Sequence, residues 1–457
     1  MLPFVATAIG YQLLVLRTNI DLEHNCDEVQ LPSLRALKFK KENTTNGTDQ
    51  KYVHHMSSPS SVLPVYSDLI GNTELLQLSR LSSLLTSVAP PKTKINLLVK
   101  LENRNPSGTC KDRVALGMLT AALHKISLSP HPPPKRVTFV EGTSGSTGIS
   151  LSSIISNLPP SLPFTTSFLC VCPSDMSVQK RDYIVRLGAD LLVVDPRSIA
   201  SEHHYVNVAR RRANEINAKD GGKGEHIAIF LDQFSNDDNW KTHYNTTGPE
   251  IHEQLRSLGI STLDGFIVGA GTGGTIVGVG SRLKQIYPNV QVVLADPQGS
   301  VLANRINEGI AWVREATEAT VKRKRVDTFV EGIGCDRVTA ILSRGIDRSL
   351  IDSAVSVTDQ HTLDMADYLL SSSGLFVGGS SGVHVVAAAK TALQIARQRP
   401  NGGIITVLTT ICDSGDRHLS RMWSKDYIEG KRGLRFPAAA SKQESAEDKI
   451  LRIINSE

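Results

Sequence analysis

Asn105-Pro106-Ser107-Gly108-Thr109-Cys110-Lys111-Asp112-Arg113 is the stretch that points most directly to the fold. The residues before it, 96–102, are mostly apolar with strand character, and residues 114–123 combine apolar side chains with good helix formers. Lys111 is therefore expected near a helix N-terminus, where the positive end of the helix dipole and Arg113 would both favour an uncharged amine. A lysine that can lose its proton suits Schiff-base chemistry with a carbonyl compound. Taken alone, Lys111 is better explained as a solvated side chain in a first helical turn.

A glycine-rich segment, residues 269–274, follows the expected strand 265–268 and precedes an expected helix. Glycines let backbone N–H groups approach a phosphate, and the helix end adds positive potential. Thr272 and Thr275 are best explained as extra hydroxyl donors to a single phosphate monoester. The segment also satisfies Gly-x-Gly-x-x-Gly, and Asp296 closes the next expected strand about where a dinucleotide site holds its ribose. A nicotinamide-dependent enzyme is therefore the alternative, although such a site needs neither Lys111 nor the two loops that follow.

Two further loops also follow expected strands. Residues 143–148 come after the strand 136–140, and hydroxyls and N–H groups at a helix start would suit the α-carboxylate of an amino acid. Residues 378–382 come after an expected strand at 375–377, and by themselves they would be a glycine-rich turn capped by serine. The other expected strands are 165–171, 190–195, 226–231, 291–295 and 404–408, and the expected helices include 176–187, 205–218, 248–258 and 363–370.

Residues 105–113 resemble the lysine motif of the cysteine synthase family of pyridoxal-phosphate enzymes, whose usual form is Asn-Pro-Gly/Ala-Gly-Ser-Val-Lys-Asp-Arg. Further matches run in family order over roughly residues 62 to 425, and so many matches in order are very specific. They are Ile70–Thr73, Thr143–Gly148, Leu231–Phe234, Thr246–Glu250, Gly271–Thr275, Glu331–Gly334, Gly378–Gly382 and Cys412–Arg417. The extra hydrophobic N-terminus is similar to that of the fungal branch of this family.

The resemblance implies the type II pyridoxal-phosphate fold, with two three-layer α/β domains and the cofactor in the cleft between them. Strands with little polar alternation, separated by helices, agree with parallel sheets covered on both faces. We expect residues 62–430 to form the catalytic part, with an N-terminal subdomain at about 104–235. The C-terminal subdomain would combine about 62–103 with 236–430, and residues 431–457 would form a peripheral tail.

The resemblance also implies roles for individual residues. Lys111 would hold pyridoxal 5′-phosphate and act as the catalytic base, and Ser380 would bond the pyridine nitrogen and leave it largely unprotonated, which favours β-elimination and replacement. The phosphate would be bound by Gly271, Thr272, Gly273, Gly274 and Thr275, and the substrate by Thr143, Ser144, Thr147 and Gln233. Ser146 stands where the family usually has an asparagine that contacts the cofactor's 3′ oxygen. A serine is shorter and would need a water or a backbone shift to reach it.

The activity implied is that of a cysteine synthase, which makes L-cysteine and acetate from O-acetyl-L-serine and sulfide by way of an aminoacrylate. Cystathionine β-synthase, serine or threonine dehydratase and O-phosphoserine sulfhydrylase share the fold and stay open as alternatives. The expectation that no regulatory domain pair follows residue 430 disfavours the β-synthase and the dehydratase. An inactive homologue tethered to a membrane is the alternative from another class, and Ser146 is its only support.

The bulk properties are those of an ordinary globular protein. The 457 residues are 40% hydrophobic and 21% charged, and a net charge of +5 implies no nucleic-acid partner. The basic cluster 322–325 is best explained as a solvated face. The six cysteines lack Cys-x-x-Cys spacing, so neither a metal site nor a disulfide framework is indicated, and a reducing compartment is expected.

The N-terminus has a largely apolar segment at residues 2–16, which is short for a membrane span. We interpret it as a weak membrane anchor joined to the catalytic part by a polar linker at residues 41–61, so that residues 1–61 stand apart from the fold. A mitochondrial location is expected, with the cytoplasm as the alternative, although acidic residues at 21–28 are unusual for a presequence. A homodimer is expected by analogy with the family.

Overall fold

The computed structural model describes residues 65–310, 328–335, 337–437 and 445–456. The predicted anchor at residues 2–16, the linker at 41–61 and the basic cluster at 322–325 lie outside the described residues. Within those ranges no helix is both long enough and apolar enough to cross a bilayer.

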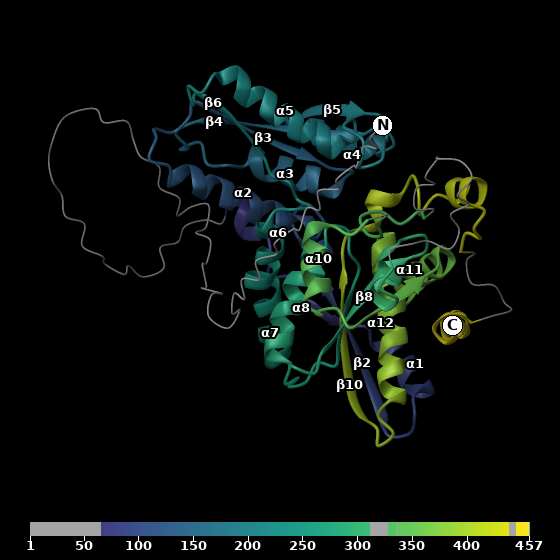
Figure 1. Cartoon of the computed structure of the whole chain (residues 1–457). Helices are drawn as coiled ribbons and strands as arrows, with labels where there is room; N and C mark the ends of the chain where they lie inside the picture. Colours follow the sequence, from purple (N-terminus) through teal and green to yellow (C-terminus); the bar gives the residue numbers. More distant parts are fainter. Residues whose placement is uncertain (1–64, 311–327, 336, 438–444, 457) are drawn as a thin grey trace, which may run out of the picture. The chain divides into compact units, whose positions relative to one another are not determined.

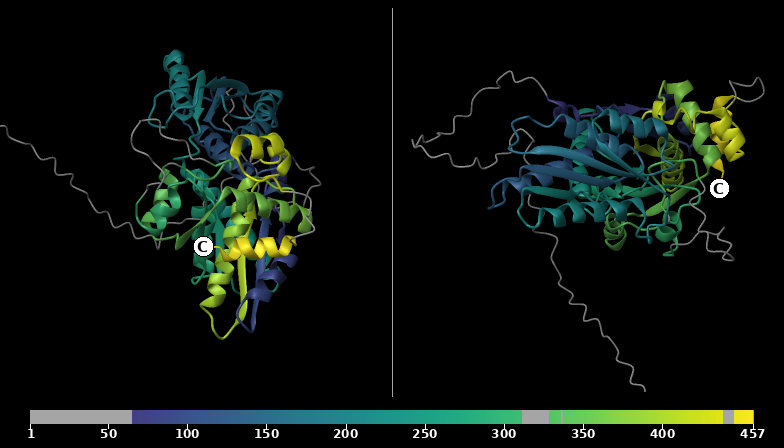
Figure 2. Two further views of the ribbon diagram at one scale, coloured as in Figure 1. Left: turned by 90° about the vertical axis from the view of Figure 1, so that its right-hand side faces the viewer. Right: turned by 90° about the horizontal axis from the view of Figure 1, so that it is seen from above.

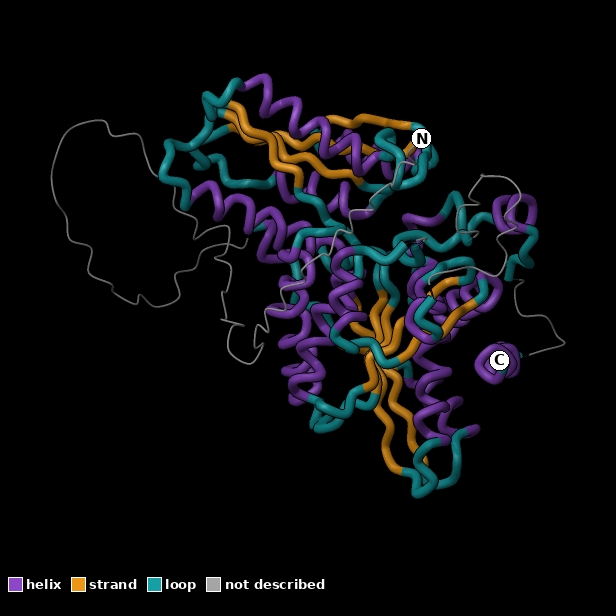
Figure 3. The backbone as a smooth tube through the Cα atoms, in the orientation of Figure 1, coloured by secondary structure: helices purple, strands orange, loops and turns teal. Residues whose placement is uncertain are grey.

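Two sheets organise the described chain (Figures 1 and 3). One has six strands in the order β1-β2-β10-β7-β8-β9, and the other has four in the order β5-β4-β3-β6. Every neighbouring pair is parallel except β1 and β2. The strands are β1 Leu75–Gln77, β2 Thr93–Leu101, β3 Arg136–Gly142, β4 Thr165–Pro173, β5 Asp190–Val194, β6 His226–Phe230, β7 Gly265–Val268, β8 Gln291–Pro297, β9 Ser353–Val357 and β10 Gly403–Ile411.

Helices cover both faces of each sheet, as the turned views in Figure 2 also show. They are α1 Ser79–Val88, α2 Lys111–Ser127, α3 Ser146–Ser156, α4 Val178–Arg186, α5 Tyr205–Asp220, α6 Asp237–Thr242, α7 Gly248–Ser257, α8 Gly274–Ile286, α9 Leu302–Asn307, α10 Ala340–Asp347, α11 Asp359–Ser373, α12 Gly379–Arg397 and α13 Ala446–Asn455. Short 3₁₀ helices lie at Tyr66–Leu69, Glu102–Arg104 and Gly415–His418, and π-helical turns at His243–Thr247 and Asp426–Lys431.

The hydrophobic cores follow from this layering. Around the six-stranded sheet, α1, α11 and α12 enclose one core, and α7, α8 and α10 enclose another on the opposite face. Around the four-stranded sheet, α2, α3 and α4 pack on one face and α5 on the other. Strands buried on both faces have near-continuous apolar sequences, which is why β7 and β8 were recognisable. The predicted α/β class with three-layer units is confirmed.

An early strand pairs with the last one. β2 runs parallel to β10 along its whole length, with Leu98 opposite Leu408, although β3 to β9 lie between them in sequence. The chain therefore leaves the six-stranded sheet after β2, builds the four-stranded sheet, and returns at β7. Lys111 lies in the segment that connects β2 of the first sheet to β3 of the second. This is how the lysine comes to lie between the two sheets.

One predicted strand is wrong. Residues 375–377 form no strand, because Val377 makes a single bridge with Ser414 and the chain enters α12 at Gly379. The Val377 carbonyl instead accepts a hydrogen bond from the Trp423 indole at 2.9 Å. The apolar character of the segment reflects burial and does not reflect sheet pairing.

The end of the chain contributes to the core. Helix α13 buries Ile450, Ile453 and Ile454 against α11 and α12, and Lys449 pairs with Asp364 at 2.7 Å. Residues 431–457 had been expected to form a peripheral tail because residues 438–443 are polar. Residues 438–443 lie outside the described residues. The helix that follows them is packed against the core, so the prediction of a peripheral tail is wrong for α13.

Candidate active site

A cavity of about 720 Å³ is lined by loops from both sheets, which is a size typical of small-molecule sites. Most of the predicted site residues line it, namely Lys111, Thr143, Ser144, Ser146, Thr147, Gln233, Gly271, Thr272 and Ser380. Gly273, Gly274 and Thr275 are not among the lining residues. The described lining carries more cations than anions, with Lys111, Lys180, Arg197, Arg337, Arg421 and Arg432 against Asp175, Glu331 and Asp413. The cavity therefore suits anionic ligands.

Lys111 is the first residue of α2. Asp112 accepts a hydrogen bond from the backbone N–H of Ser107 at 2.8 Å, and this bond closes the loop 105–111 over the start of the helix. The Lys111 amine donates to the Sγ atom of Cys110 at 3.3 Å. The loop thus presents the amine to the cavity from a helix end that its own side chains hold in place.

The pKa of the Lys111 amine departs from the sequence-based expectation. Burial, the largest single cause, lowers this pKa, but Cys110, Cys412 and Asp413 act in the opposite direction, and the net pKa is raised above its ordinary value. Arg113 had been expected to favour the uncharged amine, but it is not among the main causes of the shift, and its guanidinium is paired with the two carboxylates described next.

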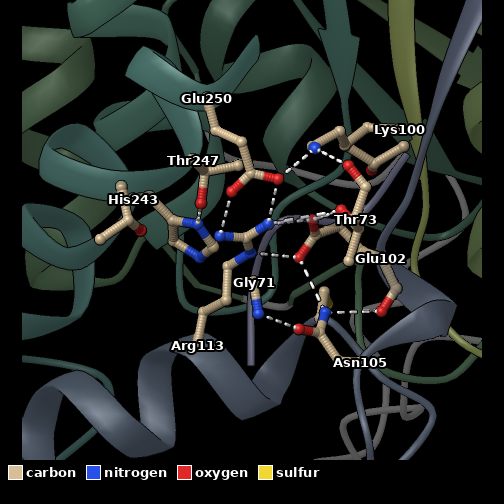
Figure 4. A network of polar contacts seen from close by, with 12 residues as sticks. Gly71, Thr73, Lys100, Glu102, Asn105, Arg113, His243, Thr247 and Glu250 are labelled. Atoms are coloured by element: carbon tan, nitrogen blue, oxygen red, sulfur yellow. Dashed lines mark hydrogen bonds and ion pairs between the residues drawn. The ribbon is translucent and has the colours of Figure 1, made fainter. Parts of the chain in front are cut away.

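A buried network of charges lies behind the lysine loop (Figure 4). The Arg113 guanidinium bonds Glu102 at 2.7 Å and Glu250 at 2.9 Å, and the Lys100 amine also pairs with Glu250. Burial by itself would raise the pKa of the Glu102 carboxyl. The Arg113 guanidinium is the strongest of the groups that act against burial, and the net pKa is lowered to about 2. Asn105 donates to the Glu102 backbone carbonyl at 2.8 Å. The network joins β2, α2 and α7, so it holds the lysine loop against the six-stranded sheet.

The glycine-rich loop between β7 and α8 is shaped by the absence of side chains. A Cβ atom on Gly271 would lie 2.2 Å from the Gly332 carbonyl oxygen, and one on Gly274 would lie 1.8 Å from Asn239 Oδ1. Gly273 has φ +89°, a conformation that favours glycine. Gly273, the N-cap residue of α8, has no side chain to cap the helix, and the Gly274 N–H donates to the Thr272 hydroxyl at 3.3 Å. The start of α8 therefore offers backbone N–H groups and a threonine hydroxyl to an anion.

The two threonines of this loop differ. Thr272 lines the cavity, and its hydroxyl accepts a hydrogen bond from Asn239 at 3.1 Å. Thr275 instead bonds His243 at 3.2 Å. His243 is fully buried, and burial lowers its pKa to about 3, so the ring is neutral. Sequence reasoning missed Asn239 and His243, because neither belongs to a motif and both become partners of the loop only through packing.

The loop at 143–148 begins α3 and faces the cavity. The Thr147 hydroxyl donates to the side-chain carbonyl of Gln233 at 2.8 Å, and the Gln233 amide donates to the Gly142 carbonyl at 3.0 Å. Thr143 accepts from the Gly145 N–H at 3.2 Å. Gln233, which the family resemblance associated with this loop, thereby lies beside it although it is 86 residues away in sequence.

Ser146 has a partner that the sequence did not reveal. Its hydroxyl accepts a hydrogen bond from Arg417 Nη1 at 3.3 Å, across 271 residues of chain. The same guanidinium lies over Gly108, where an added Cβ would be 3.7 Å from it. Arg417 therefore places a positive charge between the lysine loop and Ser146. The only available signal was its membership of the motif at 412–417.

Ser380 lies in the first turn of α12, is 5% exposed and lines the cavity. Asp296, the acidic residue of the nicotinamide alternative, is in a different environment. It is fully buried and accepts a hydrogen bond from the Ala303 N–H at 2.8 Å, and burial raises its pKa to about 7. A carboxyl enclosed in this way cannot hold a ribose, so the nicotinamide alternative is wrong.

The sequence profile of the family described as "Pyridoxal-phosphate dependent enzyme" matches residues 66–413. The chain belongs to this family. Its cofactor is therefore pyridoxal 5′-phosphate, and the matched range contains nearly the whole described cavity.

Similar proteins point the same way. "Cysteine synthase 2" of Emericella nidulans is 40% identical over 410 residues, covering 87% of this chain and 88% of that protein. The "Putative mitochondrial cysteine synthase" of Saccharomyces cerevisiae is 40% identical over 359 residues, covering 78% and 83%. Among solved structures, that of an O-ureido-L-serine synthase has a TM-score of 0.59 at 28% identity, covering 81% of this chain and 96% of that one.

The residues of the cavity fit the cofactor. The Lys111 amine could react with the aldehyde of the cofactor. The glycine cradle at the start of α8, with the Thr272 hydroxyl, could bind its phosphate, and the hydroxyls at the starts of α3 and α12 could bind its ring or the substrate. Two described lysines line the cavity. Lys180 is paired with Glu331, whereas Lys111 directly follows Cys110, whose backbone N–H bonds the Cys412 carbonyl, so Lys111 is the better candidate to hold the cofactor.

Proposed function

We propose that the protein is a cysteine synthase that replaces the acetyl group of O-acetyl-L-serine by sulfide, giving L-cysteine and acetate. The observation that carries this proposal is the convergence of Lys111, the hydroxyl-rich loop 143–147 and Gly271–Thr272 on one cavity. The relatives that are named cysteine synthases support the choice of reaction.

Lys111 has two roles in the proposal. Its Nζ atom holds the cofactor covalently, and the same amine, once free, accepts the proton from the α-carbon of the amino acid. When bound, the cofactor supplies an electron-withdrawing group that makes this proton acidic. The amine must be neutral to accept a proton, and burial works in that direction while the nearby sulfur atoms work against it.

The remaining residues bind and orient. Thr143, Ser144 and Thr147, with Gln233, hold the α-carboxylate through hydroxyls and the N-terminus of α3. Residues 271–275 hold the phosphate through backbone N–H groups, and Ser380 bonds the pyridine nitrogen. Ser146 and Arg417 share the position near the 3′ oxygen, with the guanidinium as the charged donor.

The test is a product analysis of the purified protein loaded with pyridoxal phosphate. We expect cysteine and acetate in equal amounts from O-acetylserine and sulfide. Cystathionine from serine and homocysteine would indicate the β-synthase, a keto acid from serine or threonine alone a dehydratase, and preference for O-phosphoserine the phosphate-using sulfhydrylase. Absence of every product from protein that retains its cofactor would support the inactive homologue and contradict the proposal.

The subdomain boundaries, the homodimer and the location also belong to the proposal. A relative named as mitochondrial supports a mitochondrial location, and residues 2–16 remain the proposed membrane anchor. Removing residues 1–60 should leave activity unchanged, because the polar sequence of residues 41–61 predicts a linker across which few core contacts would form. Fractionation checks this. Full-length protein should pellet with membranes and resist salt extraction while the truncated protein stays in the supernatant, and soluble full-length protein would contradict the anchor.

A further inference from the structure

Two cysteines meet beside the cofactor lysine. Thr109 and Asp413 form an antiparallel bridge, and the next backbone hydrogen bond runs from the Cys110 N–H to the Cys412 carbonyl at 2.8 Å. Cys110 and Cys412 are therefore opposite each other where the lysine loop crosses the end of β10. Both line the cavity and both are free thiols.

The backbone geometry allows a covalent link. The pair makes one backbone hydrogen bond, because the Cys412 N–H donates to the Ser381 hydroxyl at 3.0 Å. Opposite residues of an antiparallel pair have Cα atoms about 4.5–5.5 Å apart. Disulfides require Cα atoms about 4.4–6.8 Å apart, so the backbone would not need to move far. Both thiols line the same cavity and each shifts the pKa of the other, as expected for side chains that face each other across the pair.

The two thiols are chemically unequal. The neighbouring Cys110 thiol lowers the pKa of Cys412, and Lys111 adds to this effect. Cys412, together with burial, raises the pKa of Cys110. His384 is 3.8 Å from Cys412 but is no base for it, because its Nε2 accepts from the Gly269 N–H at 2.7 Å. Its Nδ1 must then carry the proton, which it donates to the Thr410 carbonyl at 2.9 Å.

We propose that Cys110 and Cys412 form a reversible disulfide when a peroxide enters the cavity, which makes the pair an oxidative modification site next to Lys111. The Cys412 sulfur attacks hydrogen peroxide, so that an S–O bond forms, the O–O bond breaks, and hydroxide leaves as water after taking the Cys412 proton. The Cys110 sulfur then attacks Cys412, so that the S–S bond forms, the S–O bond breaks, and the second hydroxide leaves as water with the Cys110 proton. Two thiols and one peroxide thus give one disulfide and two waters.

The link would act on Lys111. The Cys110 sulfur that now contacts the Lys111 amine would be bound to Cys412, and Cys110 directly precedes the lysine. A small displacement of a catalytic group can cost about 10²-fold in rate, so we expect turnover to fall about tenfold or more and to return with dithiothreitol. This effect goes beyond the proposed reaction, since any chemistry that uses Lys111 would be affected.

The experiment uses the full-length protein with its cofactor, treated with hydrogen peroxide and then alkylated. The chain has six cysteines, and one disulfide removes two thiols, so the number of alkylated thiols should fall from six to four. Tryptic digestion should yield residues 105–111 joined to residues 398–417, each with one cysteine. The joined peptide should weigh about 2 Da less than its parts, because two hydrogen atoms are lost. These readouts do not depend on the substrate.

Three variants complete the design. Cys110→Ser and Cys412→Ser should each abolish the joined peptide. Cys335→Ser is the matched control, because Cys335 lines the same cavity but its thiol donates to the Gly271 carbonyl at 3.4 Å, and it should keep the joined peptide. Sulfenic or sulfinic acid on Cys412 without the joined peptide would overturn the proposal. So would a disulfide between other cysteines, or activity loss with all six thiols still alkylated.

Discussion

The lysine loop and the glycine-rich loop lie on the same cavity but are built in opposite ways. Residues 105–113 are held by side chains, through the bonds of Arg113, Glu102 and Asn105. Residues 269–274 are held by backbone, at positions where Gly271 and Gly274 leave no room for a Cβ atom. The lysine loop therefore depends on the side chains that it carries, whereas the glycine-rich loop depends on having no side chains at Gly271 and Gly274.

The difference predicts how each loop responds to mutation. Changes in the side-chain loop should remove charge or chemistry, and the loss should depend on the group removed. Changes in the backbone loop should act through crowding, so even one added methyl group should matter. The four substitutions below test this contrast.

The largest effect is expected for Lys111→Ala. Turnover should fall by about 10³-fold or more, because a general base alone contributes about 10²–10⁴-fold and the covalent link would be lost as well. The visible absorbance of the lysine-linked cofactor should also vanish. Lys125→Ala on the same helix is the control, since that side chain is exposed and only weakly paired with Asp238 at 3.6 Å. Full turnover of Lys111→Ala would refute the central assignment.

The next effect is expected for Gly271→Ala. The added Cβ would collide with the Gly332 carbonyl, and the crowding should cost about 1–3 kcal/mol, equivalent to about 5- to 150-fold weaker cofactor retention. Dialysis followed by absorbance measures this. Gly430→Ala is matched, because nothing lies within 4 Å of its added Cβ. Equal retention in the two variants would show that the loop is not shaped by close approach.

Arg113→Met tests the side-chain network. It leaves Glu102 buried with no guanidinium, which should cost about 3–5 kcal/mol of unfolding free energy. Arg256→Met is the control, because Arg256 and Glu253 form an exposed pair on α7. Denaturant unfolding of both variants gives the difference, and similar losses would mean that the buried network adds no stability.

The pH dependence of the same variant has a definite sign. The pKa of Glu102 falls from 4.5 unfolded to about 2 folded, so its contribution is fully present above pH 4.5 and is lost as the pH falls through about 2. In Arg113→Met this acid-side loss should disappear. An unchanged acid profile would show that the guanidinium is not its cause.

The smallest effect is expected for Ser146→Asn. The amide would extend toward the cofactor and keep the bond that Arg417 now donates to Ser146. One added hydrogen bond is worth about 0.5–1.5 kcal/mol, so cofactor retention should tighten by about 2- to 10-fold. Equilibrium dialysis at several cofactor concentrations would detect this. A clear loss of both retention and turnover would mean that the pocket has adapted to serine.

The sequence alone determined much of this protein. A buried strand is apolar along its length, and ligand-binding loops often follow such strands, so the loops at 143–148 and 269–274 could be singled out locally. Lys111 was singled out through the family resemblance, because taken alone it fits a solvated side chain. The same rule failed at residues 375–377, because apolar composition records burial and not the presence of a pairing partner.

Only the tertiary structure decided the partners. Arg417 reaches Ser146 across 271 residues, Lys100 reaches Glu250 across 150, and Cys412 reaches Cys110 through the crossing of two distant segments. Cys110, Cys412 and Asp413, brought to the lysine by that crossing, raise the pKa of Lys111 against the direction that Arg113 alone suggested. Local conformation follows from a few neighbouring residues, whereas the energy of a buried charge depends on every group that packing brings within a few ångströms.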